Sequence, residues 1–353
     1  MRKVGMTALK LLGLVGIVCL VAVVLFAGVL MTLGVAARAG ESSNRASCQN
    51  NLMQFGMLYK LYAQESPGGH YPPMSLRGFE TSGGDIHMTF NFGPAVDTIY
   101  PDFLTDPGIL ICPSTPDPSH DSFMSEAGIV LTEWRGPEEG GPRTLNGKPC
   151  TDPSACIHAV DNSYWYWGFV FDKLEVEHGL APLERLSDAM SELGLIPVDR
   201  MSKLLTAQGI PLPPPAGPAQ IVHAFEHILL ERALPALEAG DLAALNAAAD
   251  ADVPATPGNA GTDTVHRLRE GVERFFITDV SNPAAADTAQ AEVFVMFDAF
   301  GVSAINRGIL YFNHIPGGSN VLYMDGHVEF IGFQERPPVT NPVADFAAAV
   351  LRR

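Results

Sequence analysis

The feature that most constrains this chain is an uncharged apolar run near its N-terminus, residues 11–37. Arg2, Lys3 and Lys10 precede the run, and Arg38 follows it. As an α-helix rising about 1.5 Å per residue, a run of this length reaches roughly 40 Å, which exceeds the ~30 Å hydrocarbon core of a bilayer. The apolar core of a cleaved signal peptide has only about 7 to 15 residues. The run therefore predicts a transmembrane helix that is retained.

Charge sets the expected location and excludes one class of partner. Because the basic residues cluster ahead of the apolar run, the positive-inside rule places the N-terminus in the cytoplasm. We expect a single-pass protein of the cytoplasmic membrane, with the lipid bilayer as a partner and a head on the periplasmic or external side. The net charge of −17 would repel a phosphate backbone, so nucleic acid is not expected as a partner.

Composition and periodicity divide the chain into seven segments. Apolar residues at three- and four-residue intervals in 42–64 predict an amphipathic helix that continues the apolar run, whereas 174–264 is rich in Ala, Leu and Glu with helical spacing. Helical spacing within it covers 183–195 and 221–249, and the tract 247–262 is expected to be a flexible exit. Short β-type runs predict strands at 108–112, 163–171, 275–280 and 293–297. The segments are 1–10 (leader and basic flank), 11–37 (transmembrane helix), 38–66 (exported helix), 67–173 (loop-rich α+β head), 174–264 (helical insertion), 265–336 (C-terminal β part) and 337–353 (tail).

Four of the five cysteines are expected to lie in the exported head, outside the apolar run that holds Cys19. An even number of cysteines in an oxidising compartment suggests disulfides. Cys150 and Cys156 are the nearest couple in sequence, which leaves Cys48 and Cys112 as the second pair. Four unpaired and partly buried thiols are the alternative.

Asp325-Gly326 is the sharpest local signal, because it separates two β-rich runs, 320–324 and 327–333. Asp-Gly between strands favours a two-residue type I′ hairpin turn. Strand alternation would also place His327 and Glu329 on one face. With His314 they could bind a cation, although no specific metal-binding spacing is present.

Two further patterns suggest alternative functions. His223, Glu226 and His227 fit the H-x-x-E-H pattern of inverted zinc peptidases, in which two histidines bind zinc and the glutamate activates water. The other interpretation is a surface helix. In the aromatic run 164–167, alternation would separate the two tyrosines from Trp165 and Trp167, which predicts either a sugar-stacking platform or a buried strand.

Several segments at both ends of the chain together resemble one family. They are GMTALKLLGLVGIV at 5–18, SCQNNLMQFGMLYKLYAQES at 47–66, GHYPP at 69–73, YPDFLTDPGILICPS at 100–114 and NHIPGGSNVLYMDGHVEFI at 313–331. The first resembles the leader of type IV pilins and type II secretion pseudopilins. Together, over roughly residues 1–120 and 265–333, they are similar to planctomycete-type prepilin-like proteins with a C-terminal His…Asp-Gly domain.

The resemblance implies an α+β fold with a pilin-like long N-terminal transmembrane helix packed on a small antiparallel sheet, here with a helical insertion. It implies leader cleavage between Gly5 and Met6, and assembly near Lys10, where pilins usually carry Glu. The family motif falls on His314, Gly317, Gly318, Asp325, Gly326 and His327, with ten residues rather than the usual nine between His314 and Asp325.

The function expected from this resemblance is that of a non-catalytic, membrane-anchored structural or assembly protein of a type II secretion or type IV pilus-like system. Its expected partners are a prepilin peptidase and other pilin-like subunits, with no cofactor. The alternatives are a membrane-anchored zinc-dependent hydrolase using the motif at 223–227, and a cell-surface glycan-binding module using Trp165.

Overall fold

The computed structural model describes residues 2–80, 84, 86–100, 102–114, 163–193, 195, 216–276, 285–303 and 309–350. Two compact units make up the chain, Met1–Ala46 and Ser47–Arg353, and the second is called the head here. Helix α1 runs from Arg2 to Glu65 and contributes residues to both. It ends before a short 3-10 turn, η1 (Pro67–Gly69), as the Pro-Gly-Gly sequence predicts.

The prediction of a transmembrane helix is wrong. Within the part of the chain that the structure describes, no helix is both long enough and apolar enough to cross a membrane. A membrane span needs about 20 consecutive apolar residues. Beyond the apolar run, from Arg38 onward, α1 carries charged and amide side chains, among them Glu41, Arg45 and Asn51. The expected location in the cytoplasmic membrane is contradicted by the same finding.

The head is built around a four-stranded antiparallel sheet with the strand order β12-β11-β8-β3. Its strands are β3 (Tyr164–Tyr166), β8 (Phe294–Asp298), β11 (Gly318–Tyr323) and β12 (Val328–Gly332). Phe297 on β8 is the register partner of Trp165 on one side and of Val321 on the other. The chain is therefore α+β, and the strand expected at 293–297 is present as β8.

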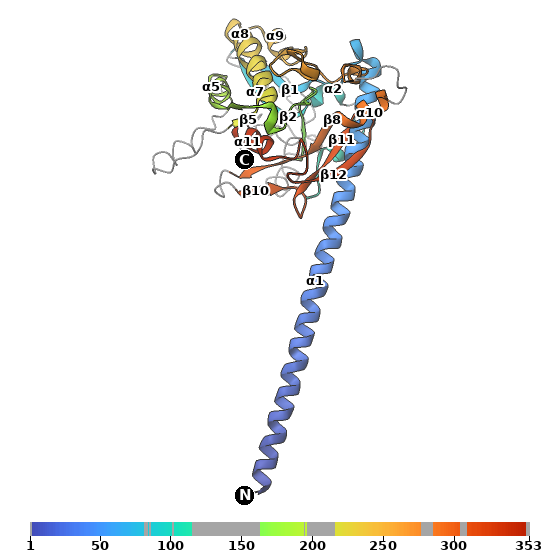
Figure 1. Ribbon diagram of the computed structural model, residues 1–353, viewed down its shortest axis with the longest axis vertical. Coiled ribbons are helices and arrows are strands. Elements are labelled where there is room, and N and C mark those ends of the chain that lie inside the picture. The colour runs from blue at the N-terminus through green and yellow to red at the C-terminus, as the bar shows by residue number, and fades with distance from the viewer. Residues whose placement is uncertain are drawn as a thin grey trace. The chain divides into compact units, whose positions relative to one another are not determined.

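The head part of α1 covers one face of this sheet (Figure 1). Phe55 and Tyr59 on α1 contact Tyr164 and Tyr166 on β3, with ring centroids 5.9 and 4.9 Å apart. The helical period of 3.6 and the strand period of 2 bring these apolar faces together. The amphipathic helix expected over 42–64 is thus confirmed.

The opposite face of the sheet forms a second core. Trp165 and Trp167 point into it and contact Phe92, with ring centroids 6.0 and 5.8 Å away. Phe92 lies on β2 (Ile86–Pro94), which pairs with β1 (Met74–Glu80) in an antiparallel hairpin. Phe346, on the C-terminal helix α11 (Asn341–Val350), stacks on the Phe92 ring at 5.7 Å. The expected separation of tyrosines from tryptophans on β3 is confirmed.

Helices of the predicted insertion belong to this second core and do not form a separate unit (Figure 1). α5 (Glu184–Glu192) matches the expectation, but the region expected to be one long helix is broken. Its successive parts are α7 (Ala219–Glu226), a π-helix η6 (His227–Ala233), α8 (Leu234–Ala239) and α9 (Leu242–Asn246). Gly240, at φ +69°, ends α8 in a left-handed conformation that glycine adopts easily.

The tract expected to be a flexible exit, 247–262, is instead ordered by hydrogen bonds. Asn259 is buried, and its amide nitrogen donates to the backbone oxygen of Val170 at 2.9 Å and to Asp172 at 2.7 Å. The backbone N–H of His266 donates to the Asn259 side-chain oxygen at 2.6 Å. These hydrogen bonds add to the buried contacts of Ala248, Ala249 and Val253, and composition alone reveals neither.

Short elements complete the described head. They are α2 (Val96–Ile99), η2 (Pro107–Leu110), η5 (Val176–His178), β4 (Leu180–Pro182), β5 (Ala216–Pro218), β6 (Val253–Pro254), η7 (Asn259–Gly261), β7 (Thr264–Val265), η8 (Val272–Phe275), α10 (Ala285–Glu292), β9 (Phe300–Ser303) and β10 (Ile309–Phe312). The strand expected at 108–112 begins instead as the 3-10 turn η2, because Pro107 and the cap from Asp106 favour a turn. The strand expected from 275 is also a 3-10 turn at its start, and 277–280 lie outside the described residues.

Asp325-Gly326 connects β11 to β12, so the predicted hairpin is confirmed, but the predicted type I′ turn is wrong. Such a turn needs two positive φ angles, and here only Gly326 has one, at +96°. The backbone N–H of Gly326 donates to Tyr323, and the N–H of Tyr323 to the oxygen of His327. The loop is three residues long and ends in a glycine bulge.

Candidate functional site

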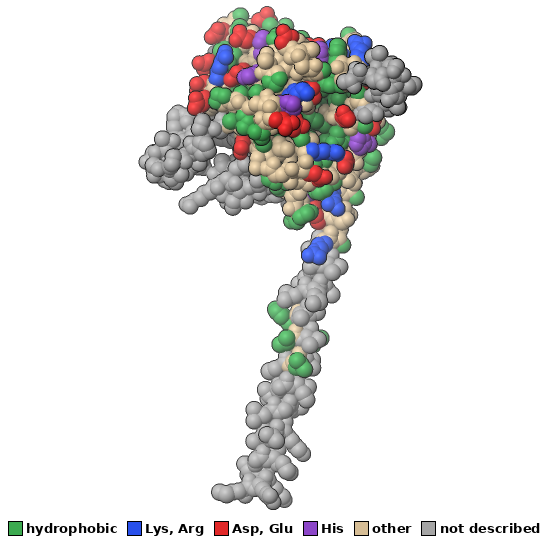
Figure 2. Space-filling view, in the orientation of Figure 1, with side chains coloured by type: hydrophobic (Ala, Val, Ile, Leu, Met, Phe, Trp, Pro, Cys, Tyr) green, Lys and Arg blue, Asp and Glu red, His purple; other side chains and the backbone are tan. Residues whose placement is uncertain are grey.

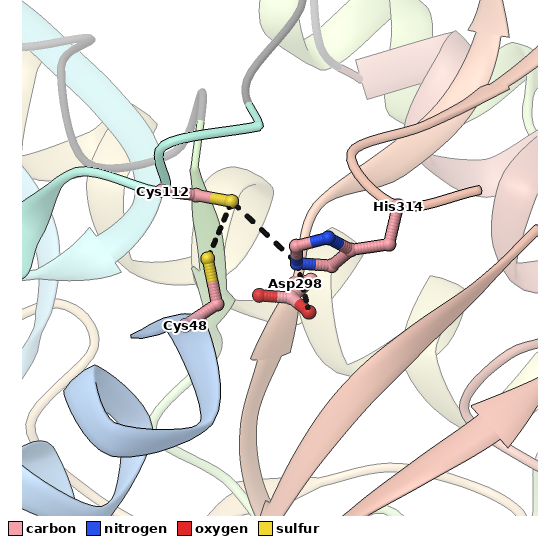
Figure 3. Close-up of side chains that lie close together, drawn as sticks. All are labelled: Cys48, Cys112, Asp298 and His314. Atoms are coloured by element: carbon pink, nitrogen blue, oxygen red, sulfur yellow. Dashed lines mark hydrogen bonds and ion pairs between the residues drawn. The ribbon is translucent and has the colours of Figure 1, made fainter. Parts of the chain in front are cut away.

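Four side chains from distant parts of the sequence meet in the interior of the head (Figure 3). Cys48 lies on α1, Cys112 follows η2, Asp298 is the last residue of β8, and His314 follows β10. All four are 0% exposed. Figure 3 shows the sulfur of Cys48 directed toward that of Cys112, and the sulfur of Cys112 and the Asp298 carboxylate beside the imidazole ring of His314.

The donor atoms are close enough to interact. The two sulfur atoms are 2.7 Å apart, and the sulfur of Cys112 is 3.6 Å from Nε2 of His314. The same Nε2 is 3.1 Å from Oδ2 of Asp298. One ligand atom from each of the four residues lies within 4.8 Å of the others.

Ser163 holds the elements of the cluster in place. Its hydroxyl oxygen accepts a hydrogen bond from the backbone N–H of Cys112 at 2.9 Å. Its carbonyl oxygen accepts from the N–H of Ala299 at 2.9 Å and from the side-chain amide of Asn313 at 3.0 Å. One residue therefore binds the neighbours of three cluster members: Cys112, Asp298 and His314.

The fourth member, Cys48, is placed by a polar residue on the next turn of its helix. The side-chain nitrogen of Asn51 donates to the carbonyl oxygen of Ile111 and to the hydroxyl of Tyr164, both at 3.1 Å. These bonds hold the residue before Cys112 against α1. The cluster is thus positioned by hydrogen bonds to backbone atoms as well as by the core.

The two oxygen atoms of the Asp298 carboxylate differ in their hydrogen bonds. Oδ2 accepts hydrogen bonds from the backbone N–H of Asn320 at 2.9 Å and from its side-chain amide at 2.6 Å, and it also pairs with His314. Oδ1 is buried and has no hydrogen-bond partner among the described residues. A buried carboxylate oxygen without a partner costs free energy, because it has lost its hydration without replacement.

Electrostatics favours an imidazolium beside a thiol in this arrangement of atoms. Burial lowers the pKa of His314, but the hydrogen bonds and charges of Asp298 and Cys112 outweigh that effect and raise the pKa to about 11. The hydrogen bond with Cys48, followed by burial, raises the pKa of Cys112 well above its usual value. Without a metal ion, these shifts favour a neutral thiol on Cys112 and an imidazolium on His314, which pairs with Asp298.

The arrangement does not form a Cys-His-Asp catalytic relay. A relay needs the carboxylate on one ring nitrogen and the nucleophile on the other. Here Asp298 and Cys112 both contact Nε2 of His314. The cluster can instead form a disulfide between its cysteines or bind a metal ion that prefers sulfur and nitrogen ligands.

The structure brings Cys48 and Cys112 together, as the predicted pairing requires, but both are free thiols. Cys150 and Cys156, the other predicted pair, lie outside the described residues. The cluster also includes His314, which was expected near His327 and Glu329 on the hairpin. Asp298 was not predicted, and its one signal in the sequence is that it is a lone acidic residue at the end of an apolar strand.

The hairpin residues are engaged elsewhere and do not form the expected cation site with His314. The exposed ring of His327 stacks on Tyr323 with centroids 4.4 Å apart, and its Nδ1 is 2.6 Å from Asp325. Glu329 forms an exposed ion pair with Arg336. His314 is fully buried in the four-residue cluster. The remaining motif residues, Gly317 and Gly318, lie at the start of β11 with positive φ angles.

The structure does not assemble the H-x-x-E-H motif into a zinc site. Across the described ranges, one group of three or more candidate metal ligands is found, and it is the Cys48 cluster. His223 donates from Nδ1 to the carbonyl oxygen of Thr256. α7 ends at Glu226 and the π-helix begins at His227, so the regular α-helical spacing on which the prediction relied is interrupted between them.

The aromatic strand is not a sugar-binding platform. Trp165 is 0% and Trp167 2% exposed, so neither ring can stack on a ligand at the surface. Gly5, Met6 and Lys10 lie within α1, but their side chains are outside what the structure describes, and leader processing stays a prediction. Comparisons with protein-family models, curated proteins and solved structures found no match.

Proposed function

We propose that this chain is a non-catalytic structural subunit that assembles with other pilin-like subunits of a type II secretion or type IV pilus-like system. The observation that carries the proposal is the exposed apolar surface of α1 within the first unit. Leu20, Val23, Leu25 and Phe26 are 64 to 66% exposed there (Figure 2). Adjacent large apolar side chains on a helix are usually covered by a partner.

The occupant that fits this surface is the corresponding helix of another subunit. Apolar helices associate by burying such faces against each other, and each fully buried Leu, Val or Phe contributes about 1.5 to 3 kcal/mol. The resemblance to pilin-like proteins, in which N-terminal helices make the subunit contacts, supports the same partner. Leader cleavage after Gly5 by a prepilin peptidase is part of the proposal.

The rest of α1 has a different role, which supplies an internal control. Residues 47–65 belong to the head, where Phe55 and Tyr59 are buried in the core. Leu61, in the same part of α1, is 52% exposed. Val23 in the first unit and Leu61 in the head are both exposed, so the same substitution can be made at each. Val23 lies on the proposed assembly surface, and Leu61 lies away from it.

The test compares Val23→Asp with Leu61→Asp in the full chain. Two differently tagged copies are produced together, and their association is measured by chemical cross-linking and co-purification. Val23→Asp should greatly reduce association, because a buried carboxylate without a partner opposes helix contact, whereas Leu61→Asp should leave it near the parental level. Equal association of the two variants, or none in the parental chain, would contradict the proposal.

A further inference from the structure

We propose that Cys48, Cys112, Asp298 and His314 form a buried structural zinc site that links α1 to the sheet of the head. This inference goes beyond the proposed function and does not depend on it, because all four residues belong to the head. It rests on the ligand types, the separations between their atoms, and one carboxylate oxygen that lacks a partner.

The ligand set suits zinc. Two thiolates, one imidazole and one carboxylate supply four donor atoms, the number that structural zinc sites use. Sulfur and imidazole ligands favour Zn²⁺ over hard cations such as Mg²⁺ and Ca²⁺, which prefer oxygen. The H-x-x-E-H motif does not meet these conditions, because its residues are not brought together as a set.

The separation between Cys112 and His314 already matches tetrahedral zinc. With Zn–S near 2.3 Å and Zn–N or Zn–O near 2.1 Å, tetrahedral geometry puts sulfur about 3.6 Å from nitrogen, and nitrogen about 3.4 Å from oxygen. The sulfur of Cys112 lies 3.6 Å from Nε2 of His314, as tetrahedral zinc requires. The 3.1 Å from Nε2 to Asp298 is measured to Oδ2, the oxygen that Asn320 holds by hydrogen bonds. The two sulfur atoms, at 2.7 Å, must separate by about 1 Å to reach tetrahedral spacing.

Asp298 distinguishes the zinc site from a simple disulfide. Its Oδ1 has no hydrogen-bond partner among the described residues although it is fully buried. A metal ion would supply that partner, while the two bonds from Asn320 keep Oδ2 in place as an outer shell. A disulfide between Cys48 and Cys112 would join the two sulfur atoms but would give Oδ1 of Asp298 no partner.

The backbone around Cys112 also favours a metal-bound thiolate. The N–H of Ser114, two residues on, points at the sulfur of Cys112 at 3.4 Å. Such a donor stabilises negative charge on sulfur. Three anionic ligands leave excess negative charge after they bind Zn²⁺. The N–H of Ser114 and the hydrogen bonds from Asn320 to Asp298 offset that charge.

Burial makes the site structural. All four ligands come from the protein and are 0% exposed, whereas catalytic zinc keeps a position for water or substrate. Binding would join α1, the turn after η2, β8 and the loop after β10. Because the unfolded chain does not hold such a site, the binding free energy adds to folding.

The test measures zinc and thiols in the purified full chain. Elemental analysis should give one zinc per chain, and alkylation after unfolding, without reductant, should find Cys48 and Cys112 as free thiols. Replacement of zinc by Co²⁺ should produce the sulfur-to-cobalt charge-transfer band and the visible bands of a tetrahedral site. A zinc-free chain, or one with a Cys48–Cys112 disulfide, would overturn the proposal without bearing on subunit assembly.

Variants assign the metal to this cluster. Cys112→Ser and the isosteric Asp298→Asn should each weaken zinc binding by at least about 100-fold, since even outer-shell changes often cost 10- to 100-fold. The double variant Cys150→Ser/Cys156→Ser and the surface variant His178→Ala should retain one zinc. Zinc retained by Cys112→Ser, or zinc lost from the double variant, would refute the assignment. If a variant fails to fold, the cobalt spectrum of the parental chain decides instead.

Discussion

At the scale of single residues, the largest side chains of this protein build the core. Trp165 contacts Phe92, Phe297 and Phe300, with ring centroids 5.3 to 6.0 Å away. Its complete burial explains why an aromatic run that could have been a ligand platform serves packing instead.

Trp165→Ala should therefore destabilise the protein by about 3 to 5 kcal/mol, because it leaves a large cavity in a core that cannot fully collapse. Chemical unfolding of the full chain measures the change. Val176→Ala is the matched control, since Val176 is 62% exposed and its truncation should cost less than about 0.5 kcal/mol. If Trp165→Ala and the parental chain unfolded at similar denaturant concentrations, Trp165 would not be part of the core.

The candidate site could be predicted only in part at this scale. The pairing of Cys48 with Cys112 followed from the even number of cysteines outside the apolar run and the shorter spacing of the other pair. Asp298 and the placement of His314 depend on tertiary contacts between β8 and the loop after β10, which no local pattern encodes. A lone Asp at the end of the run FVMFD was the available sign.

At the scale of elements, the spacing of apolar residues predicted helices and strands well. Turn residues predicted the position of the hairpin but not its turn type. The amphipathic helix that covers the sheet, the strand β8 and the hairpin of β11 and β12 were all predictable from apolar spacing. The break from α7 through the π-helix η6 to α9 was not, because tertiary packing overrides the helical pattern there. The order of 247–262 comes from the buried side chains of Ala248, Ala249 and Val253 together with the hydrogen bonds of Asn259, a polar residue that composition assigns to a loop.

The hairpin turn gives the prediction at this scale. A Cβ at Gly326 would meet nothing within 4 Å, so a substitution there tests backbone conformation alone. Gly326→Val should cost on the order of 1 to 3 kcal/mol, because a β-branched residue is strained at φ +96°. Gly326→Asn should cost less, since Asn tolerates positive φ. Thermal unfolding of both variants is the measurement, and a Val variant as stable as the Asn variant would contradict the bulged turn.

At the scale of the whole molecule, charge and apolar surface occupy different places. Acidic side chains gather over η6, α8 and the start of α9 in the head (Figure 2), where Glu231, Glu238 and Asp241 are exposed. The exposed apolar side chains of α1 lie in the first unit. The strongly negative net charge would keep heads apart, which assigns the proposed subunit contacts to the helix.

The central claim is that four side chains from separate segments bind one zinc ion inside the head. X-ray absorption at the zinc edge of the purified full chain tests it most directly. We predict two sulfur neighbours at about 2.3 Å and two nitrogen or oxygen neighbours at about 2.0 to 2.1 Å. A zinc environment made of nitrogen and oxygen alone, or a chain without zinc, would contradict the claim.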